Sequence, residues 1–472
     1  MTAATYHPKP YPYQPPQIAS SPADMNQTSS FERLGFNVLL VFLFLAFSRI
    51  FDVKFGTLHI TGISYRLVFA MVLLSRGFVT ALGTPIGKAL MGFTFFFGLS
   101  VPFSMWRGGS IPIFRDTWLL FSFAAFLAVA GLVSSYAQWR KSMTAMCVAL
   151  FVFTIIANVF GIMDNGRLFL SQGKFANPNE MAQALLLGLP LWGGVMGSAP
   201  SVPKKVWAGL VMLAMLFTTF RTGSRGAMIG FVCMLLVYFL RASIMDKMKF
   251  IVGGVVIFVI LVGVMPGRLI ARYKTTIDDD VDDSGDMDAG MKDSALSSTQ
   301  SRKQLLRRSI IFTFQHPLVG VGPGMFPLAD DFYSKAQGAN KGQWLGTHNS
   351  YTQVSSELGI PAFLFFTAAV IMSIKTPYSI YKRTRGDPRL QDMANMALGL
   401  HYCLIIYAVT IFFDYIAYTV MLPVLGGLAA ALARTADAEI QRVQSVPLPV
   451  TMSPEMFHSY LGRRPVSARQ TF

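Results

Sequence analysis

The sequence predicts an all-α polytopic membrane protein with about twelve transmembrane helices and one large outer-face loop between helices 9 and 10. Of the 472 residues, 53% are hydrophobic and only 14% are charged, which departs strongly from the composition of soluble domains. The apolar residues are gathered in blocks, and about 17 to 25 such residues cross a roughly 30 Å hydrocarbon layer as a helix. A single long polar stretch interrupts the blocks and predicts the loop.

The expected spans follow the apolar blocks in chain order. They cover residues 34–51, 57–75, 87–106, 115–134, 142–162, 179–197, 204–220, 226–242, 248–265, 350–374, 395–414 and 417–435. The predicted organisation is a tail (1–33), nine spans (34–265), the large loop (266–347), three spans (348–435) and a second tail (436–472). The first tail contains "YHPKPYPYQPP" and lacks the apolar core and cleavage site of a signal peptide, so we expect it to be disordered.

The distribution of basic residues predicts the orientation. The formal charge is +16, but most lysines and arginines lie in loops between spans, where they set topology and do not indicate nucleic-acid binding. With the N-terminus inside, the cytoplasmic loops carry more basic residues than the opposite loops, including the cluster from Lys375 to Arg389. We therefore expect both termini in the cytoplasm. The three cysteines lie far apart in expected spans, so neither a disulfide framework nor a cysteine metal site is expected.

The turn "FRTGSRGAMIG", residues 220–230, is the first candidate binding element. Arg221 and Arg225 are four residues apart beside flexible glycines, and two guanidinium groups at this spacing can bind a phosphate or diphosphate. The alternative is that both arginines only reach toward lipid headgroups from a helix end.

The segment "SRKQLLRRSIIFTFQHPLVGVGPGMF", residues 301–326, predicts an amphipathic helix followed by a folded turn that packs on it. Its basic residues include Arg302, Arg307 and Arg308. The residues expected to be available for burial are Leu305, Leu306, Ile310, Ile311 and Phe314. His316 precedes a proline, and we interpret it as structural.

The segment "GTHNSYTQVSSELG", residues 346–359, leads into the tenth apolar block. One continuous helix from Ser350 through that block would be longer than the hydrocarbon layer, so its first turns should stand at the outer interface. The polar ridge that begins at His348 should face a wet, protein-lined cavity, because polar side chains are costly against lipid. The carboxylate of Glu357 supports this inference. Alternatively, Asn349 or Ser350 merely caps the helix.

Three other features allow two interpretations each. Residues 278–293 are acidic and partly mimic a calcium loop, but the twelfth position is Met291, so a solvated segment is preferred. The residues at the start of the sixth span cap the helix or contact substrate, and these are Asn177, Asn179 and Glu180. Arg66 lies near the centre of the second span and should face a carboxylate, Glu357 or Asp414, or the substrate cavity.

Together these motifs resemble the O-antigen ligase family of bacterial inner-membrane glycosyltransferases, over about residues 34–435. The resemblance rests on "THNSYTQVSSELGIPAF", "HPLVGVGPGMF", "TGSRGAMIG" and "FANPNEMA" in this order. It implies transfer of a glycan from a polyprenyl (undecaprenyl) diphosphate carrier to an acceptor hydroxyl, such as lipid A-core, at the periplasmic face, with neither cofactor nor metal.

The resemblance also assigns roles to residues. It implies His348 as the catalytic base and Arg225, with Arg221 nearby, as a diphosphate-binding residue. The loop arginine of the family matches Arg302, while Arg307 and Arg308 on the same helix leave that assignment open. The supporting or cavity candidates are Asn349, Tyr351, Glu357, Arg308 and Arg66. A neutral histidine suits proton removal near pH 7, and fixed arginines suit the charge of the leaving diphosphate. Single displacement with inversion is the simpler mechanism to expect. Glu357 keeps a second mechanism open.

Other functions compete with the ligase interpretation. A repeat-unit polymerase uses the same donor and differs in its acceptor, and a protein-glycosylating relative is a further alternative. A secondary transporter would place its site near the bilayer midplane, often between inverted repeats. The polar groups here gather at the outer ends of spans and in one loop, which favours the enzyme.

Overall fold

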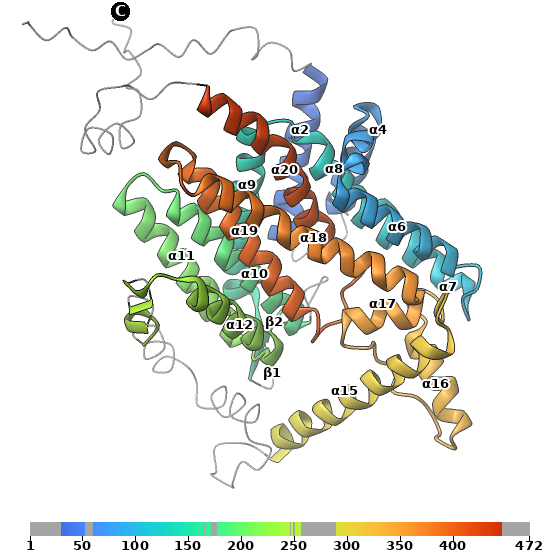
Figure 1. Ribbon diagram of the computed structural model, residues 1–472. Coiled ribbons are helices and arrows are strands. Elements are labelled where there is room, and N and C mark those ends of the chain that lie inside the picture. The colour runs from blue at the N-terminus through green and yellow to red at the C-terminus, as the bar shows by residue number, and fades with distance from the viewer. Residues whose placement is uncertain are drawn as a thin grey trace, which may run out of the picture.

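The described part of the chain is almost entirely helical (Figure 1). The computed structural model describes residues 30–51, 60–164, 166–170, 177–245, 247–248, 251–255 and 289–445. The first helices are α2 (Ser30–Ser48), α4 (Ile60–Leu74), α5 (Gly77–Gly83), α6 (Pro85–Ser100), α7 (Arg107–Pro112), the π-helical η2 (Ile113–Phe123), α8 (Ala124–Leu132) and α9 (Tyr136–Phe160). An antiparallel hairpin of β1 (Ile162–Asp164) and β2 (Arg167–Phe169) follows.

The remaining elements complete the bundle and the loop. They are α10 (Pro178–Gly197), α11 (Val202–Arg221), α12 (Arg225–Arg241), α15 (Ala289–Gln315), α16 (Phe326–Ala336), α17 (Ser350–Leu358), α18 (Ile360–Thr384), the 3₁₀ turn η4 (Pro388–Leu390), α19 (Gln391–Thr410) and α20 (Met421–Gln444). α2 begins at Ser30, before the expected start of the first span at residue 34, and α20 continues to Gln444, past the expected end of the last span at residue 435.

Short polar side chains start several of these helices. Thr84, Ser135, Asn177, Ser224 and Asn349 accept hydrogen bonds from backbone N–H groups in the first turns of α6, α9, α10, α12 and α17. Such caps satisfy donors that have no partner within the helix. The motifs "FANPNEMA", "TGSRGAMIG" and "THNSY" therefore each mark a helix start.

The helices agree with an integral membrane protein, but the expected number of about twelve spans is not confirmed. Among the described residues, six helices are long and apolar enough to cross a membrane: Ser30–Ser48, Arg107–Leu132, Tyr136–Phe160, Val202–Arg221, Ile360–Thr384 and Pro388–Thr410. Counting the pair α4 and α5, which bend by 84°, as one broken span makes seven. The 16 and 17 residues of α6 and α12 are short for a roughly 30 Å layer. Most of the expected span 248–265 lies outside the described residues.

The expectation of one continuous helix at the tenth span is wrong. α17 ends at Leu358 and α18 begins at Ile360, because the intervening Gly359 has φ 87°, a conformation that side chains other than hydrogen resist. A Cβ at Gly359 would lie 2.5 Å from the carbonyl group of Leu318. The Ile360 N–H also donates to the Pro317 carbonyl at 2.7 Å. The "HPLVG" turn therefore packs into the break between the two helices.

The described part of the large loop forms a small layer of α15, α16 and α17, with α15 extending away from the bundle (Figure 1). Leu305 and Phe312 of α15 pack against Val321, Met325 and Phe326, which confirms that the turn after α15 folds back on the helix. The expected burial of three other side chains of α15 is wrong, and the exposed residues are Leu306, Ile310 and Phe314. They are four residues apart along α15 and therefore lie on one face of the helix.

The bundle core fixes the helix ends around the candidate site. α10 packs against α9, α11, α12 and α19, while α18 packs against α6, α19 and α20. The fully buried Trp118 and Trp139 each donate a hydrogen bond, to Thr94 Oγ1 and to the Leu428 carbonyl at 2.9 and 2.8 Å, as buried indole groups require. The ends of α10, α12 and α19 are thus held by well-packed helices.

Candidate active site

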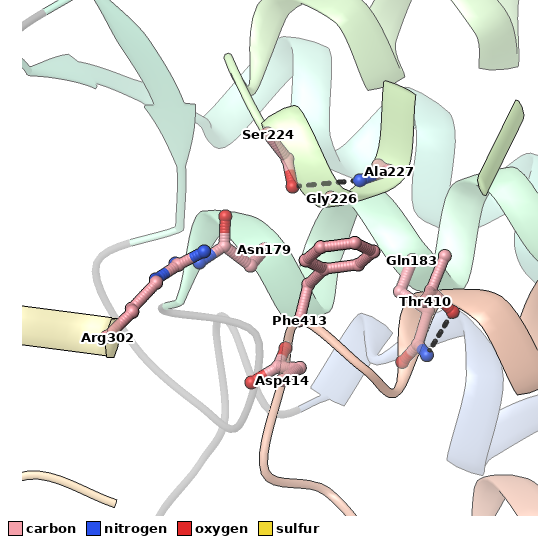
Figure 2. A pocket seen from close by; sticks show the side chains of 9 residues that line it. All are labelled: Asn179, Gln183, Ser224, Gly226, Ala227, Arg302, Thr410, Phe413 and Asp414. Carbon is pink, nitrogen blue, oxygen red and sulfur yellow. Dashed lines mark hydrogen bonds between the residues drawn. The ribbon is translucent and has the colours of Figure 1, made fainter. Parts of the chain in front are cut away.

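A small polar pocket lies where α10, α12, α15 and the end of α19 meet (Figure 2). Its lining residues are Asn179, Gln183, Ser224, Gly226, Ala227, Arg302, Thr410, Phe413 and Asp414. Gln183 donates to Thr410 Oγ1 at 2.6 Å, and Ser224 Oγ accepts from the Ala227 N–H at 3.4 Å. The walls are thus internally hydrogen-bonded, and the two charged groups of the lining are Arg302 and Asp414.

Two guanidinium groups lie near each other at this pocket. Arg302 extends from α15 toward Asn179 (Figure 2), and the half-buried Arg225 is the first residue of α12. Burial, followed by the charge of Arg225, lowers the pKa of Arg302, whereas the charge of Asp414 raises it. The N-terminus of α12 adds a partial positive charge. This arrangement favours a multiply charged anion such as a diphosphate.

Asp414 supplies a carboxyl group to the same pocket. Its side chain is 3% exposed, and Oδ1 accepts a hydrogen bond from the Tyr415 N–H at 2.9 Å. Oδ2 is buried without a hydrogen-bond partner in the described part of the chain. Burial raises the pKa of Asp414 to about 6, against smaller lowering effects of the Tyr415 N–H and of Arg302. A buried carboxylate oxygen without a partner is suited to accept a hydrogen bond from a bound hydroxyl.

His348 lies close enough to Arg302 for the two groups to interact electrostatically. Burial, and then the charge of Arg302, lower the pKa of His348 to about 4, so the imidazole is neutral at pH 7. Its ring meets Tyr415 edge-on at a centroid distance of 5.3 Å. The buried Nδ1 atom has no hydrogen-bond partner among the described residues. His348 therefore offers a neutral nitrogen that no described protein group occupies.

The turn that carries His348 is held against the loop that carries Asp414. The Ser350 N–H donates to the Ile411 carbonyl at 2.8 Å, and Ser350 Oγ donates to the Asp414 carbonyl at 2.8 Å. Ser350 Oγ in turn accepts from the Ile416 N–H at 2.9 Å. His348 itself has φ 50°, a left-handed conformation that costs energy for a non-glycine residue. The histidine is thus fixed relative to Asp414 by backbone contacts.

Asn349 and Tyr351 support this turn. Asn349 caps α17, with Oδ1 accepting from the N–H groups of Tyr351 and Thr352 at 2.9 and 3.2 Å. The Tyr351 hydroxyl donates to the Ala408 carbonyl at 3.1 Å, and its ring lies 4.5 Å from that of Phe412. The capping alternative is therefore confirmed for Asn349. Both side chains fix α17 against the end of α19.

Glu357 does not face the wet cavity expected from the sequence. It is 3% exposed and accepts hydrogen bonds from the Gly324 N–H at 2.8 Å, the Phe326 N–H at 3.4 Å and the Tyr418 hydroxyl at 2.7 Å. The polar ridge is likewise packed, since Ser355 Oγ lies 2.8 Å from Thr313 Oγ1 of α15. Glu357 thus joins the "GVGPGMF" turn to the loop before α20.

The other arginines considered from sequence lie outside the pocket lining. Arg308 lies 4.0 Å from the Tyr333 ring centroid and 3.9 Å from Asp330, and Arg307 is exposed, so among these three arginines of α15 it is Arg302 that reaches the pocket. Arg221 donates to Asn158 Oδ1 at 2.7 Å.

The expected pairing of Arg66 with Glu357 or Asp414 is not what the structure shows. Arg66 is exposed, lies over the Tyr65 ring and is near enough to Asp116 for their charges to interact.

Sequence reasoning missed two pocket features. From the sequence, Asp414 is only a candidate partner of Arg66, because a single carboxylate after an apolar block belongs to no recognisable motif. Arg167 in β2 donates to Asn179 Oδ1 at 2.8 Å and to the Thr222 carbonyl at 2.9 Å, and so links the hairpin to α10 and to the turn before α12. The "NGR" turn was a possible signal for a hairpin at Arg167.

The described residues contain no group of three or more histidine, cysteine or acidic side chains that could hold a metal ion. The acidic segment 278–293, which partly mimics a calcium loop, lies outside the part that the structure describes, apart from the backbone of its last residues.

The comparisons with known proteins agree with this geometry. Residues 210–367 match the family model described as O-antigen ligase, a stretch that contains Arg225, Arg302 and His348. A comparison with curated proteins returned no match. The family match indicates a membrane glycosyltransferase of the ligase and polymerase kind. The match over residues 210–367 therefore supports the similarity of this chain to the O-antigen ligase family.

Proposed function

We propose that this protein transfers a glycan from a polyprenyl diphosphate carrier to an acceptor hydroxyl, such as one of lipid A-core, at the periplasmic face of the bacterial inner membrane. The observation that carries the proposal is the convergence of Arg225, Arg302 and His348. These residues come from three separate motifs. Arg302 lines the pocket with Asp414, and both Arg225 and His348 lie near enough to Arg302 to interact with it electrostatically.

The arginines would bind the diphosphate and stabilise its departure. As the bond between the anomeric carbon and the diphosphate oxygen breaks, negative charge grows on that oxygen. Arg225 and Arg302 are partly buried, and their positive charges repel each other. A bound anion would therefore offset this electrostatic repulsion. Preorganised donors in such sites contribute strongly to catalysis. The same charges supply what a metal ion provides in other transferases, and we propose metal-independent transfer.

His348 would accept the proton of the acceptor hydroxyl as its oxygen attacks the anomeric carbon. A pKa of about 4 makes His348 a weak base, so proton transfer becomes favourable only when the hydroxyl has begun to form the new bond. This timing suits a neutral nucleophile in a single displacement with inversion. Asp414 would accept a hydrogen bond from a sugar hydroxyl through Oδ2. The three protein hydrogen bonds that the Glu357 oxygens accept argue against a role of Glu357 as nucleophile.

The orientation follows from the charge distribution, with both termini in the cytoplasm and the pocket at the periplasmic side. A repeat-unit polymerase is the nearest alternative, because the same pocket serves its donor. A protein glycosyltransferase differs only in its acceptor. A transporter is less well supported, since the polar pocket lies at helix ends.

The test uses purified protein in vesicles with a glycan on polyprenyl diphosphate as donor. Lipid A-core, a second carrier-linked repeat unit and an acceptor peptide are supplied separately, and product is followed by gel shift and mass spectrometry. We expect transfer to lipid A-core that Arg225→Ala reduces about a hundredfold or more, with Arg307→Gln as the matched control. Transfer only to the repeat unit would replace the ligase by a polymerase. Solute movement without turnover of the donor would reject the enzyme.

A further inference from the structure

A second and larger cavity lies in the bundle between α10, α11, α12 and α19. Its volume is about 730 Å³, and the apolar side chains of Leu189, Met212, Phe231 and Leu398 are among those that line it. This is within the size range of sites that enclose small ligands. It shares no lining residue with the polar pocket around Arg302, so it requires a separate explanation.

Two glycines leave space in this cavity without a local reason. A Cβ on Gly209 of α11 would meet nothing within 4 Å, and one on Gly193 of α10 would meet only Met212 Cε at 3.9 Å. By contrast, a Cβ on Gly399 would lie 2.6 Å from the Pro190 carbonyl oxygen, so that glycine permits close helix packing. Glycine in a helix interior is unfavourable relative to alanine. The open positions of Gly209 and Gly193 therefore leave room for an occupant of the cavity.

The cavity is separated from the polar pocket by tight packing at Gly230. A Cβ on Gly230 would lie 2.6 Å from Thr410 Cγ2 and 3.5 Å from Leu186 Cδ2, and Thr410 lines the polar pocket. On α12, the cavity lining runs from Phe231 to Tyr238. It thus ends about one helical turn from Arg241 and lies away from the Arg225 end.

The far end of the cavity is bordered by cationic side chains. Arg241 lies over the Tyr378 ring at 4.5 Å and donates to His401 Nε2 at 2.7 Å. Lys382 Nζ lies 4.7 Å from the same ring centroid. His401 adjoins Tyr402, which lines the cavity. An apolar chamber with Arg241 about one helical turn beyond its lining on α12, and with Lys382 at the same tyrosine ring as Arg241, matches a ligand that has a hydrocarbon chain and an anionic head.

We propose that this cavity binds an acyl chain of an anionic membrane phospholipid, with the lipid phosphate at Arg241 and Lys382. The surrounding membrane supplies such a ligand at high local concentration. Each basic residue near a membrane surface attracts anionic headgroups. The packing at Gly230 argues against the tail of a carrier lipid whose diphosphate is held at Arg225. In the proposed orientation, the site draws its lipid from the cytoplasmic leaflet.

The experiment measures which phospholipids remain bound to the full-length protein. The chain is reconstituted in vesicles of equal phosphatidylglycerol and phosphatidylcholine, extracted in mild detergent and examined by native mass spectrometry. We expect the wild type to retain phosphatidylglycerol in preference to phosphatidylcholine, and Arg241→Gln to lower that preference about fivefold. Gly209→Phe should fill the cavity and abolish retention of both lipids. Gly83→Phe is the matched control, because a Cβ on Gly83 also meets nothing within 4 Å.

Three results would overturn the proposal. The first is equal retention of the two phospholipids by the wild type, or retention of neither. The second is a loss in Gly83→Phe as large as that in Gly209→Phe, with thermal melts showing that both variants are folded. The third is displacement of bound phosphatidylglycerol by added polyprenyl phosphate, which would assign the cavity to the carrier lipid. Glycan transfer is not part of this readout, so the outcome is independent of the proposed enzymatic function.

Discussion

Replacing Arg302 tests whether the positive charge at the polar pocket accelerates glycan transfer. Three arginines on α15 experience different surroundings, since Arg302 lines the pocket, Arg307 is exposed and Arg308 lies over Tyr333. Removing one preorganised donor from an anionic transition state typically costs about 10²- to 10³-fold in rate, or roughly 3–4 kcal/mol. We therefore expect Arg302→Gln to lower the transfer rate by about that factor. Arg302→Lys should recover only part of it, because lysine cannot bind phosphate oxygens bidentately.

The two neighbouring arginines provide the controls. Arg307→Gln should keep transfer within about twofold of the wild type, as expected for an exposed side chain. Arg308→Gln should lower thermal stability, through loss of its contacts with Tyr333 and Asp330, more than it lowers the transfer rate of folded protein. The four variants and the wild type are compared in vesicles at equal amounts of inserted enzyme. Equal losses in Arg302→Gln and Arg307→Gln would refute the assignment of Arg302.

Further predictions concern pH, Glu357 and chelation. Protonation removes the base, so transfer by Asp414→Asn should stay level from about pH 8 to pH 5 and fall only as His348, with its pKa of about 4, becomes charged; a half-loss near pH 6.5 in this variant would contradict this. Any inflection near pH 6 belongs to Asp414, whose pKa is about 6, and should disappear in Asp414→Asn. Glu357→Ala leaves two backbone N–H groups and the Tyr418 hydroxyl without an acceptor, and should destabilise the fold by about 2–5 kcal/mol in denaturation experiments; unchanged stability with lost transfer would make Glu357 catalytic. EDTA should leave transfer within about twofold, because the arginines supply the positive charge, and a large loss restored by a divalent cation would reject the metal-free mechanism.

The membrane character and the motifs of the candidate site could be predicted from the sequence, because both depend on local patterns. Apolar blocks mark helices through their length alone, and Asn349 was recognisable as a cap from its place before a helix. Arg225 was recognisable through its glycine-rich turn. These features need no knowledge of distant parts of the chain.

Features that depend on packing between distant segments were not accessible. The break at Gly359 requires the backbone of Leu318 to occupy the space of a Cβ. The burial of Glu357 requires the turn at Gly324 to approach it from another element. The role of Asp414 emerges only when α15 brings Arg302 beside the end of α19. In each case the sequence shows the residue but not its partner.

The most direct test of the central claim is glycan transfer by His348→Ala, measured at equal membrane insertion and with the thermal stability of the variant matched to that of the wild type. Loss of the base should reduce the rate about 10²- to 10⁴-fold while the affinity for the polyprenyl diphosphate donor, held by Arg225 and Arg302, changes little. Transfer at the wild-type rate would contradict the account, and the converging residues would then serve only to position the loop.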